Sequence, residues 1–507
     1  MAETKGKRMK VIIIGAGPAG LSCGYELVKA GVEVEVYEAS PYVGGMARSF
    51  DLWGQRVDMG PHRFFSKEKH INEFFTTLVK DDYTLVNRMT RIYYRNRFFY
   101  YPIKLFNVLR NLPPFTIVSI LWEFLRIQMF PYKNPTTFEE WVSNRFGRKL
   151  FEIFFKHYSE KLWGIPCSKI DADWAAQRIK SLSLWEAVIS AIFGNKGNKH
   201  KTLLDQFAYP NLGTGTLYER AADFIRSHGG KVNLQSPVKK VMQDAGSGMQ
   251  DAGCGMQDAG SGMQDAGSGM QDAGCGITGI ELMDGTVVKA DYVVSTMPLT
   301  LLVKGLKDVP ADVAAAAEKL YFRNTILVYL EVDSMELFAD NWIYVHSPEV
   351  KHGRITNFRN WSRQINRDKK TTILCMEFWA FDEDEIWKDK DENIAELAKK
   401  EIHLLKLVPP ETKILNTFVL KVPRCYPVYE TGYQVNLKKV ENYLDTVPSL
   451  IPIGRYGAFK YNNQDHSILM GILAADKITQ GLDTDLWKIN TDVEYQEEAR
   501  IKDVLIQ

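Results

Sequence analysis

The chain has 507 residues, of which 45% are hydrophobic and 25% are charged. This composition is typical of a folded globular protein with room for more than one domain. Because 63 lysines and arginines are balanced by 62 aspartates and glutamates, no global field attracts nucleic acid or an acidic membrane, and functional cations are expected to act locally in a cleft. Six cysteines without a CxxC pair indicate neither a zinc site nor a disulfide framework, and they favour a reducing cytoplasm.

The N-terminal residues MAETKGKRMK are short and polar, which is not the pattern of a secretory signal. The most apolar long segment is 113–130, PPFTIVSILWEFLRIQMF, and Glu123 and Arg126 interrupt it. A membrane span needs about 20 predominantly apolar residues in succession. We therefore predict no transmembrane segment here, and an amphipathic helix packed within the protein instead.

Residues 10–40 have the pattern of a strand, a tight turn, a helix and a second strand. Gly15, Gly17 and Gly20 follow the apolar run VIII at GxGxxG spacing, which allows the turn, the approach of a pyrophosphate and close packing of the helix on the strand. Glu38 ends the second strand, where a carboxylate can accept a hydrogen bond from a ribose hydroxyl. The pattern predicts a dinucleotide site, and by itself it leaves FAD and NAD open.

A second glycine pair follows at Gly44 and Gly45, with Arg48 just beyond it, in PYVGGMARSFDLWGQRVDMGPHRFF. The same stretch ends with Gly60 and His62. It resembles the flavoprotein superfamily of amine oxidases, protoporphyrinogen oxidases and UDP-galactopyranose mutases. The resemblance implies that FAD is the cofactor, that the GGxxR segment follows its pyrophosphate and that DMGPH approaches the flavin ring. No second strand-linked GxGxxG is present for a nicotinamide nucleotide.

The resemblance also implies an α/β fold class, with a Rossmann-type FAD-binding domain of the glutathione-reductase kind assembled from discontinuous segments, a helical cap and an antiparallel substrate sheet. We predict the FAD-binding domain over 8–65, 212–300 and 448–484, the cap over 66–211, the antiparallel sheet over 301–447 and a C-terminal tail over 485–507. Val238, where the chain re-enters the FAD-binding domain, is expected beside the cofactor.

Five copies of MQDAG[SC]G occupy residues 242–276. Two glycines in every heptad are incompatible with a coiled-coil helix. The spacing matches no calcium-binding repeat, so we predict a flexible loop with no catalytic role, and we predict no metal site in the chain.

Arginines and tyrosines recur in four segments that are far apart in the sequence. They are Arg178 in DADWAAQRI, Arg354 in GRITNFRNWS, Tyr426 in VPRCYPVY, and Arg455, Tyr461 and Asn463 in GRYGAFKYNNQDHS. Taken singly, such side chains often only pack against the protein. Together they offer the several cationic and hydroxyl donors that a diphosphate requires.

These segments resemble the substrate site of eukaryotic-type UDP-galactopyranose mutases. The resemblance implies that all six residues contact a nucleotide sugar, mainly at its diphosphate. It further implies that five residues lie against the flavin: Gly454, Gln464, Asp465, His466 and Ser467. We predict His62, Arg354 and Arg455 as the catalytic side chains.

Two activities fit this reading. The favoured one is a mutase acting on a nucleotide-diphosphate sugar, in which reduced flavin is the nucleophile and the sugar ring is isomerised. The alternative is an FAD-dependent oxidase, dehydrogenase or desaturase that takes hydride from an unidentified substrate, and the aromatic cap suits a larger apolar molecule. A non-catalytic FAD protein is disfavoured by Glu38, the GGxxR segment and the cleft arginines. The partner is expected to be a small molecule, and assembly into a homo-oligomer stays open.

Overall fold

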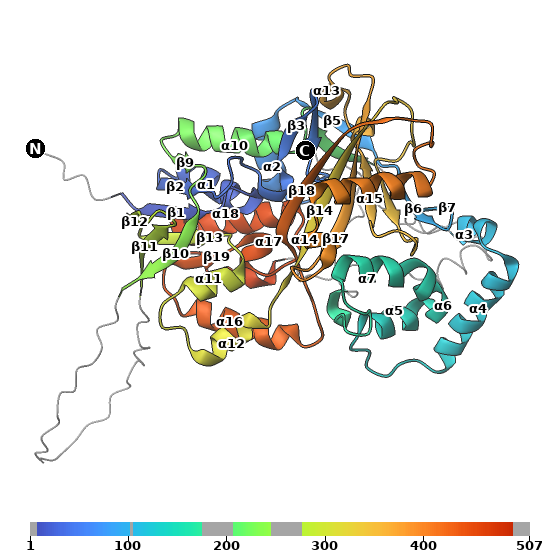
Figure 1. The fold of residues 1–507 in the computed structure, drawn as a ribbon. Coiled ribbons are helices and arrows are strands. Elements are labelled where there is room, and N and C mark those ends of the chain that lie inside the picture. The colour runs from blue at the N-terminus through green and yellow to red at the C-terminus, as the bar shows by residue number, and fades with distance from the viewer. Residues whose placement is uncertain (1–7, 102–104, 175–205, 245–275, 490–507) are drawn as a thin grey trace, which may run out of the picture.

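The structure is a computed structural model that describes residues 8–101, 105–174, 206–244 and 276–489 (Figure 1). Arg178 and nearly all of the MQDAG[SC]G repeat lie outside these ranges. The described chain forms two main sheets surrounded by helices, so the predicted α/β fold class is confirmed.

The first strand lies in the middle of a five-stranded parallel sheet. In spatial order the strands are β19 (Leu450–Pro452), β13 (Tyr292–Ser295), β1 (Lys10–Ile14), β2 (Glu33–Tyr37) and β9 (Lys231–Asn233). Residues 11–14 of β1 are buried, as a strand with neighbours on both sides and helices over its faces requires. Packed together beside this sheet are α1 (Pro18–Lys29), α10 (Gly215–Ser227) and α18 (Gln464–Gln480).

An antiparallel sheet borders the first one. It consists of β10 (Val238–Gln243), β11 (Ile277–Leu282) and β12 (Val287–Lys289). A turn at Asp284–Gly285 joins the last two strands, and Gly285 has a φ of +88°. A five-stranded sheet whose strands come from the beginning, the middle and the end of the chain confirms the expected assembly from discontinuous segments.

The second main sheet has seven strands. In spatial order they are β18 (Ile414–Pro427), β14 (Phe322–Val332), β17 (Thr372–Ala380), β16 (Arg354–Asn357), β15 (Trp342–Val345), β6 (Thr90–Tyr94) and β7 (Arg97–Tyr100). All neighbours are antiparallel except β15 and β6, which run parallel. Two further pairs are β3 (Ser49–Leu52) with β4 (Gln55–Asp58), and β5 (Tyr83–Asn87) with β8 (Gln206–Pro210).

Residues 83–100 differ from the helical pattern expected over 66–211. They form β5, β6 and β7, and the last two extend the seven-stranded sheet. A tight turn at Arg95 and Asn96, with φ values of +48° and +59°, joins β6 to β7. Such a turn suits a two-residue hairpin, which explains why this aromatic stretch is not helical.

The remaining helices cover the edges and faces of the two sheets. In chain order they are α2 (Lys69–Val79), α3 (Leu105–Asn111), α4 (Pro114–Met129), α5 (Phe138–Phe146), α6 (Arg148–Phe151), a π-helical turn (Glu152–Lys156), α7 (His157–Trp163), α11 (Leu299–Gly305), α12 (Ala311–Glu318), α13 (Arg363–Asn366), α14 (Glu385–Lys388), α15 (Asp391–Leu404), α16 (Tyr433–Asp445) and α17 (Gly454–Gly457). Short 3₁₀ turns lie at Gly45–Ala47, Phe358–Asn360 and Leu486–Lys488. Within the described ranges, no helix has the length and hydropathy needed to cross a bilayer.

Candidate active site

A cavity of about 720 Å³ is lined by residues of both main sheets. On one side it meets the carboxyl ends of β1 and β2, which is where open α/β sheets bind their ligands. On the other side it reaches β15, β16 and β18 of the seven-stranded sheet. The cavity therefore joins the predicted cofactor region to the predicted substrate region.

The turn between β1 and α1 has the geometry of a phosphate-binding loop. Gly15 has a φ of +98°, and a Cβ atom there would lie 2.1 Å from Oγ1 of Thr296. A Cβ atom at Gly20 would lie 2.0 Å from the carbonyl oxygen of Gly15. Both positions therefore require glycine. Pro18 begins α1, and the N-terminus of that helix borders the cavity with its unpaired N–H groups.

Glu38 lines the cavity just after β2, and its carboxylate is fixed by two backbone groups. Oε2 accepts a hydrogen bond from the N–H of Ala16 at 2.8 Å, and Oε1 accepts one from the N–H of Ser40 at 2.9 Å. Each carboxylate oxygen retains capacity for a second donor. The position thus suits a ribose hydroxyl, and Val238 lines the same cavity.

The second glycine pair packs against the first glycine-rich loop. Gly44 and Gly45 have φ values of +98° and +53°, and a Cβ atom at Gly45 would lie 3.1 Å from Cα of Gly17. The Arg48 guanidinium lies 5.4 Å from the centroid of the Tyr42 ring, and its Nε is buried without a hydrogen-bond partner among the described residues. A buried guanidinium donor next to two glycines, which carry no side chain to obstruct a ligand, fits the pyrophosphate of a dinucleotide.

The three side chains predicted to be catalytic come together. Burial, together with the positive charges of Arg354 and Arg455, lowers the pKa of His62 to about 3, so the imidazole is neutral at pH 7. Its Nδ1 is buried and makes no hydrogen bond within the described part of the chain. With so low a pKa, the ring is a weak proton acceptor.

Arg354 forms a buried ion pair with Glu377. The two residues lie directly opposite each other on β16 and β17, where Nε donates to Oε1 at 2.6 Å and Nη2 donates to Oε2 at 2.5 Å. Burial alone would lower the pKa of Arg354, but the Glu377 carboxylate holds it well above its usual value. The guanidinium is therefore charged, and a protein carboxylate already neutralises it.

Arg455 lies beside a stacked pair of tyrosine rings, Tyr426 and Tyr461, whose centroids are 5.5 Å apart, and it donates to the backbone. Its Nε donates to the carbonyl of Cys425 and its Nη1 to the carbonyl of Asn462, both at 2.8 Å. The guanidinium carbon lies 4.6 Å from the ring centroid of Tyr426 and 4.5 Å from that of Tyr461. Two of its donors are therefore bonded to backbone carbonyls, and two aromatic rings lie against the cation.

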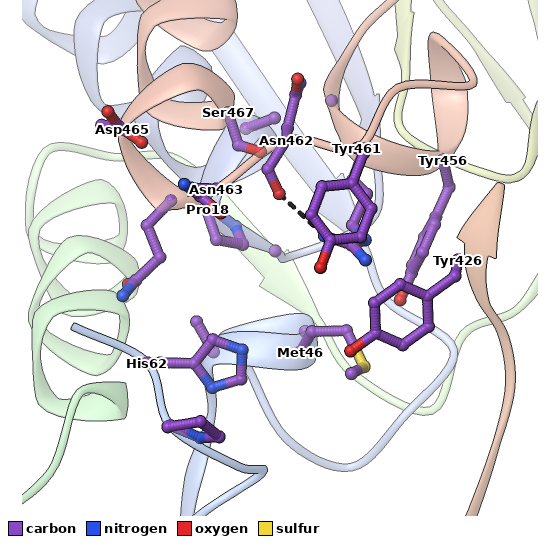
Figure 2. Close-up of a pocket in the computed structure, with 18 of the residues that line it drawn as sticks. Pro18, Met46, His62, Tyr426, Tyr456, Tyr461, Asn462, Asn463, Asp465 and Ser467 are labelled. Carbon is purple, nitrogen blue, oxygen red and sulfur yellow. Dashed lines mark hydrogen bonds between the residues drawn. The ribbon is translucent and has the colours of Figure 1, made fainter. Parts of the chain in front are cut away.

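Tyr426 links this group to Arg354, whose Nη2 lies 3.4 Å from the tyrosine hydroxyl. Figure 2 shows His62 and Met46, from the N-terminal segment, facing Tyr426 and Tyr461, from the C-terminal part of the chain. His62, Arg354, Tyr426, Arg455 and Tyr461 thus converge from distant segments of the described chain.

Gln464 is held rigidly at the start of α18. Its Oε1 accepts from the hydroxyls of Tyr218 at 2.6 Å and Thr214 at 3.2 Å, and its Nε2 donates to the carbonyl of Arg63 at 3.1 Å. The buried Asp58 carboxylate in turn accepts from the backbone N–H of Thr214 at 3.2 Å. This network fixes the end of the DMGPH segment against the NQDHS helix.

The part of the cavity beneath the helices is apolar. Its lining consists of Ile92, Tyr101, Phe138, Phe154, Phe155, Tyr158, Leu162, Trp174, Trp342 and Tyr344. These residues come from β6, β15, α5, α7 and the π-helical turn, together with short flanking segments. Two further cationic side chains of the lining, Arg63 and Arg88, both have interaction partners. Within the described ranges, no group of three or more His, Cys, Asp or Glu side chains is placed to hold a metal ion.

The cavity lining contains most of the predicted site residues. They are Gly15, Gly17, Glu38, Gly45, His62, Val238, Arg354, Tyr426, Gly454, Arg455, Tyr461, Asn463, Gln464, Asp465 and Ser467. Four predicted positions, Gly20, Gly44, Arg48 and Gly60, are not part of the lining. His466 also lies outside it, because its Nδ1 accepts from the backbone N–H of Asn463 at 3.4 Å and caps α18.

The most important residue that sequence reasoning missed is Glu377. It is the only charged residue in the strand sequence TILCMEFWA, every position of which is buried. A lone carboxylate in a buried strand requires a cationic partner. The isolated carboxylate is visible in the sequence. Its pairing with Arg354 is not, because that pairing depends on the register of two strands.

The family pattern described as flavin containing amine oxidoreductase matches residues 18–423. The chain belongs to this family. FAD is therefore the cofactor, as predicted, and the glycine loops, Glu38 and Arg48 provide a site that fits it.

Curated relatives match over short segments. The zeta-carotene desaturase of Zea mays is 38% identical over 90 residues, which cover 18% of this chain and 16% of that relative. The carotenoid phi-ring synthase of Chlorobaculum tepidum is 28% identical over 161 residues, which cover 28% of this chain and 25% of that relative. The matched parts thus span at most about a quarter of these two relatives.

Solved structures match over almost the whole chain. A reduced UDP-galactopyranose mutase has a TM-score of 0.79 at 23% identity, covering 97% of this chain and 99% of the other. Cyclohexylamine oxidase from Brevibacterium oxydans has a TM-score of 0.61 at 15% identity, covering 94% of this chain and all of the other. At such identities these matches establish the fold.

Proposed function

We propose that the protein is an FAD-dependent oxidoreductase that oxidises an elongated, largely apolar substrate by removing a hydride and a proton. The observation that supports this most strongly is the apolar part of the cavity, which aromatic and aliphatic side chains line. A hydrocarbon chain would replace water there at a gain of about 25 cal/mol for each Å² of apolar surface buried.

The charge balance of the cluster around Arg354 speaks against binding of a diphosphate at that point. Arg354 and Arg455 are positive, Glu377 is negative and His62 is neutral, so this cluster carries a net charge of about one. A diphosphate would bring at least two negative charges next to a buried carboxylate. The cost of removing the diphosphate from water would be only partly offset by attraction to Arg354, because the Arg354 guanidinium is already paired with Glu377.

The chain's own residues bind the substrate, orient it and keep water out. Phe138 and Trp174 pack with ring centroids 5.1 Å apart, and Trp174 packs on Trp163 at 5.2 Å, which gives this part of the cavity a stiff aromatic wall. Bound FAD supplies the acceptor for the hydride. The proton from the substrate is released to water, and oxygen or a quinone serves as the final acceptor.

The relatives support this class of chemistry better than the mutase activity favoured from sequence. Desaturation, which the names of the zeta-carotene desaturases state, removes hydrogen from a substrate. The match to a mutase structure, at 23% identity, supports the shared fold.

A nucleotide-sugar mutase is the second candidate, because one observation favours it. Arg354 and Arg455 both contact Tyr426, so basic and phenolic groups do meet at one point of the cavity. The Glu377 carboxylate disfavours diphosphate binding at this point, because it already neutralises Arg354.

An anaerobic titration separates the two proposals. Oxidised holoenzyme is mixed with long apolar polyenes, long-chain alkylamines or UDP-galactopyranose, and the flavin absorbance is followed while products are analysed. We expect an apolar compound to bleach the flavin and to yield a product with two fewer hydrogens. Isomerisation of UDP-galactopyranose by dithionite-reduced enzyme, without net use of electrons, would instead establish the mutase.

A further inference from the structure

Helix α4 exposes a continuous apolar stripe on its outer face. The stripe consists of Phe115, Val118, Leu121, Trp122, Leu125 and Met129, and Phe130 follows directly after the helix. Phe115, Trp122 and Phe130 are 76%, 63% and 74% exposed. At 100° per residue the six helical positions fall on one side of α4, while Ile120, Phe124 and Ile127 face inward and are buried.

The helix is firmly held, so the exposed stripe is a fixed feature of the surface. Its inner face packs on α5 and α6. Gly147, between those two helices, allows α4 to approach so closely that a Cβ atom there would lie 2.9 Å from the backbone nitrogen of Phe124. In Figure 1, α4 forms the outer edge of the helical layer on the side away from the five-stranded sheet.

A second cavity, of about 440 Å³, opens at the N-terminal end of α4. Phe115 and Thr116 of α4 line it, together with the basic side chains of Arg95, Arg97 and Lys149. Glu152 is its acidic residue and lies 3.2 Å from Lys149, so three positive charges face one negative charge. A basic cavity thus adjoins an apolar stripe.

The surrounding segment is also basic. Among the described residues between 95 and 134 there are five lysines and arginines (Arg95, Arg97, Arg110, Arg126 and Lys133) and a single acidic residue, Glu123. The whole chain, in contrast, has a net charge of only +1. Apolar side chains with Trp and Phe, flanked by Lys and Arg, are what a helix lying in the membrane interface presents to anionic lipid.

We propose that the outer face of α4 and the basic cavity at its N-terminal end form a docking surface for an anionic phospholipid bilayer. The apolar stripe enters the boundary between headgroups and acyl chains, while Arg95, Arg97 and Lys149 meet lipid phosphate. A second copy of the chain is a poorer occupant, because an isologous interface would bring the basic faces of both copies together.

The position of this surface also deepens the proposed function, and this part rests on that function. Phe99 lines the basic cavity, and its ring packs edge-on against that of Phe154, which lines the main cavity, at 5.0 Å. One aromatic pair thus separates the proposed bilayer contact from the apolar part of the main cavity. A lipid-dissolved substrate would have a short route to the flavin.

Vesicle flotation of the purified holoenzyme tests the docking surface. Vesicles of phosphatidylcholine alone are compared with vesicles of phosphatidylcholine mixed with phosphatidylglycerol. The variant Phe115→Ser/Trp122→Ser is compared with Val435→Ser/Met283→Ser, in which two apolar residues that are 72% and 64% exposed elsewhere are changed in the same way. Retention of the flavin spectrum verifies that each variant is folded.

We expect the wild type to float with the mixed vesicles and the α4 variant to lose at least about tenfold in partition coefficient, while the control variant binds as the wild type does. Arg95→Gln/Lys149→Gln should lower binding to the anionic vesicles several-fold. A wild type that stays free of lipid, or an α4 variant that binds equally, overturns the proposal. Dimers that dissociate in the α4 variant, without vesicle binding, would instead assign the face to self-association. Flotation needs no turnover, so its failure would leave the proposed oxidation untouched.

Discussion

Replacing Glu377 by Gln tests the charge balance on which the proposed function depends. The substitution keeps the shape of the side chain and one oxygen acceptor, but it removes the negative charge opposite Arg354. The guanidinium would then be buried without a counter-charge. We expect the variant to be less stable than the wild type and to bind a nucleoside diphosphate more tightly.

The magnitude follows from the geometry of the pair. The two contacts are 2.6 and 2.5 Å long, and the Arg354 and Glu377 side chains are only 16% and 2% exposed. At about 4 Å between charge centres and an effective dielectric constant of about 20, the attraction is about 4 kcal/mol. Removing one partner of a buried pair costs about 3–5 kcal/mol, and the remaining amide contact places Glu377→Gln near the lower end of that range.

The change in ligand binding has the opposite sign. The local charge rises from about one to about two, and a freed guanidinium can form charge-assisted hydrogen bonds of about 1.5–3 kcal/mol with phosphate oxygens. We therefore expect UDP to bind at least about tenfold more tightly to the variant than to the wild type. Urea unfolding of the holoenzyme and calorimetric titration with UDP measure the two effects.

Asp340→Asn is the matched control. Asp340 forms a similar two-bond pair with Arg91, at 2.9 and 2.7 Å, and it lies outside the cavity lining. The control should lose comparable stability without any change in UDP affinity. The reasoning is refuted if Glu377→Gln unfolds at the same urea concentration as the wild type, or if both bind UDP equally well.

Three further predictions follow from the geometry. Gly15→Ala should abolish most FAD retention, because the new Cβ would lie 2.1 Å from a threonine oxygen. The control Gly31→Ala, whose new Cβ would have nothing within 4 Å, should retain FAD. Equal flavin-to-protein absorbance ratios in the two variants would contradict this prediction. Phe154→Ala should raise KM for an apolar substrate severalfold at unchanged flavin content, and an unchanged KM would remove Phe154 from the substrate site. Burial lowers the pKa of His346 from 6.5 to about 3, so its neutral form contributes stability above pH 6.5 that is lost as the pH falls towards 3. The unfolding free energy of His346→Phe should fall less steeply over that range, by up to about 1.4 kcal/mol per pH unit, and parallel curves would contradict the assignment.

The cofactor half of the site could be predicted from sequence because its determinants are local. Gly15, Gly20 and Glu38 lie within one strand–helix–strand unit, and the required spacing is fixed by backbone geometry. The second glycine pair follows within ten residues of Glu38. Periodicity and spacing were therefore sufficient to indicate a dinucleotide site, whereas its assignment to FAD came from the family resemblance.

The substrate half depended on contacts between distant segments. The meeting of Arg354, Tyr426 and Arg455 was anticipated from family resemblance, whereas the neutralisation of Arg354 by Glu377 follows from the register of β16 and β17. Register between strands 23 positions apart in sequence is not visible in a single chain. The net charge of the cluster, on which the proposed substrate class depends, could therefore not be predicted from the sequence.

For helix α4, the sequence could not predict which face is exposed. Besides its polar face the helix has two apolar faces, so the helical pattern alone could not tell which of the two packs inward and which is exposed. The strands at 83–100 were missed for a related reason, because their aromatic residues fit a helical core as well as a hairpin.

The most direct test of the central claim is the electron count of a single turnover. Oxidised holoenzyme is mixed without oxygen with a limiting amount of a long apolar substrate, and reduced flavin and dehydrogenated product are both quantified. Our account predicts one reduced flavin for each product molecule and no reaction with UDP-galactopyranose. Product formation without flavin reduction, or ring isomerisation of the nucleotide sugar by the reduced enzyme, would contradict it.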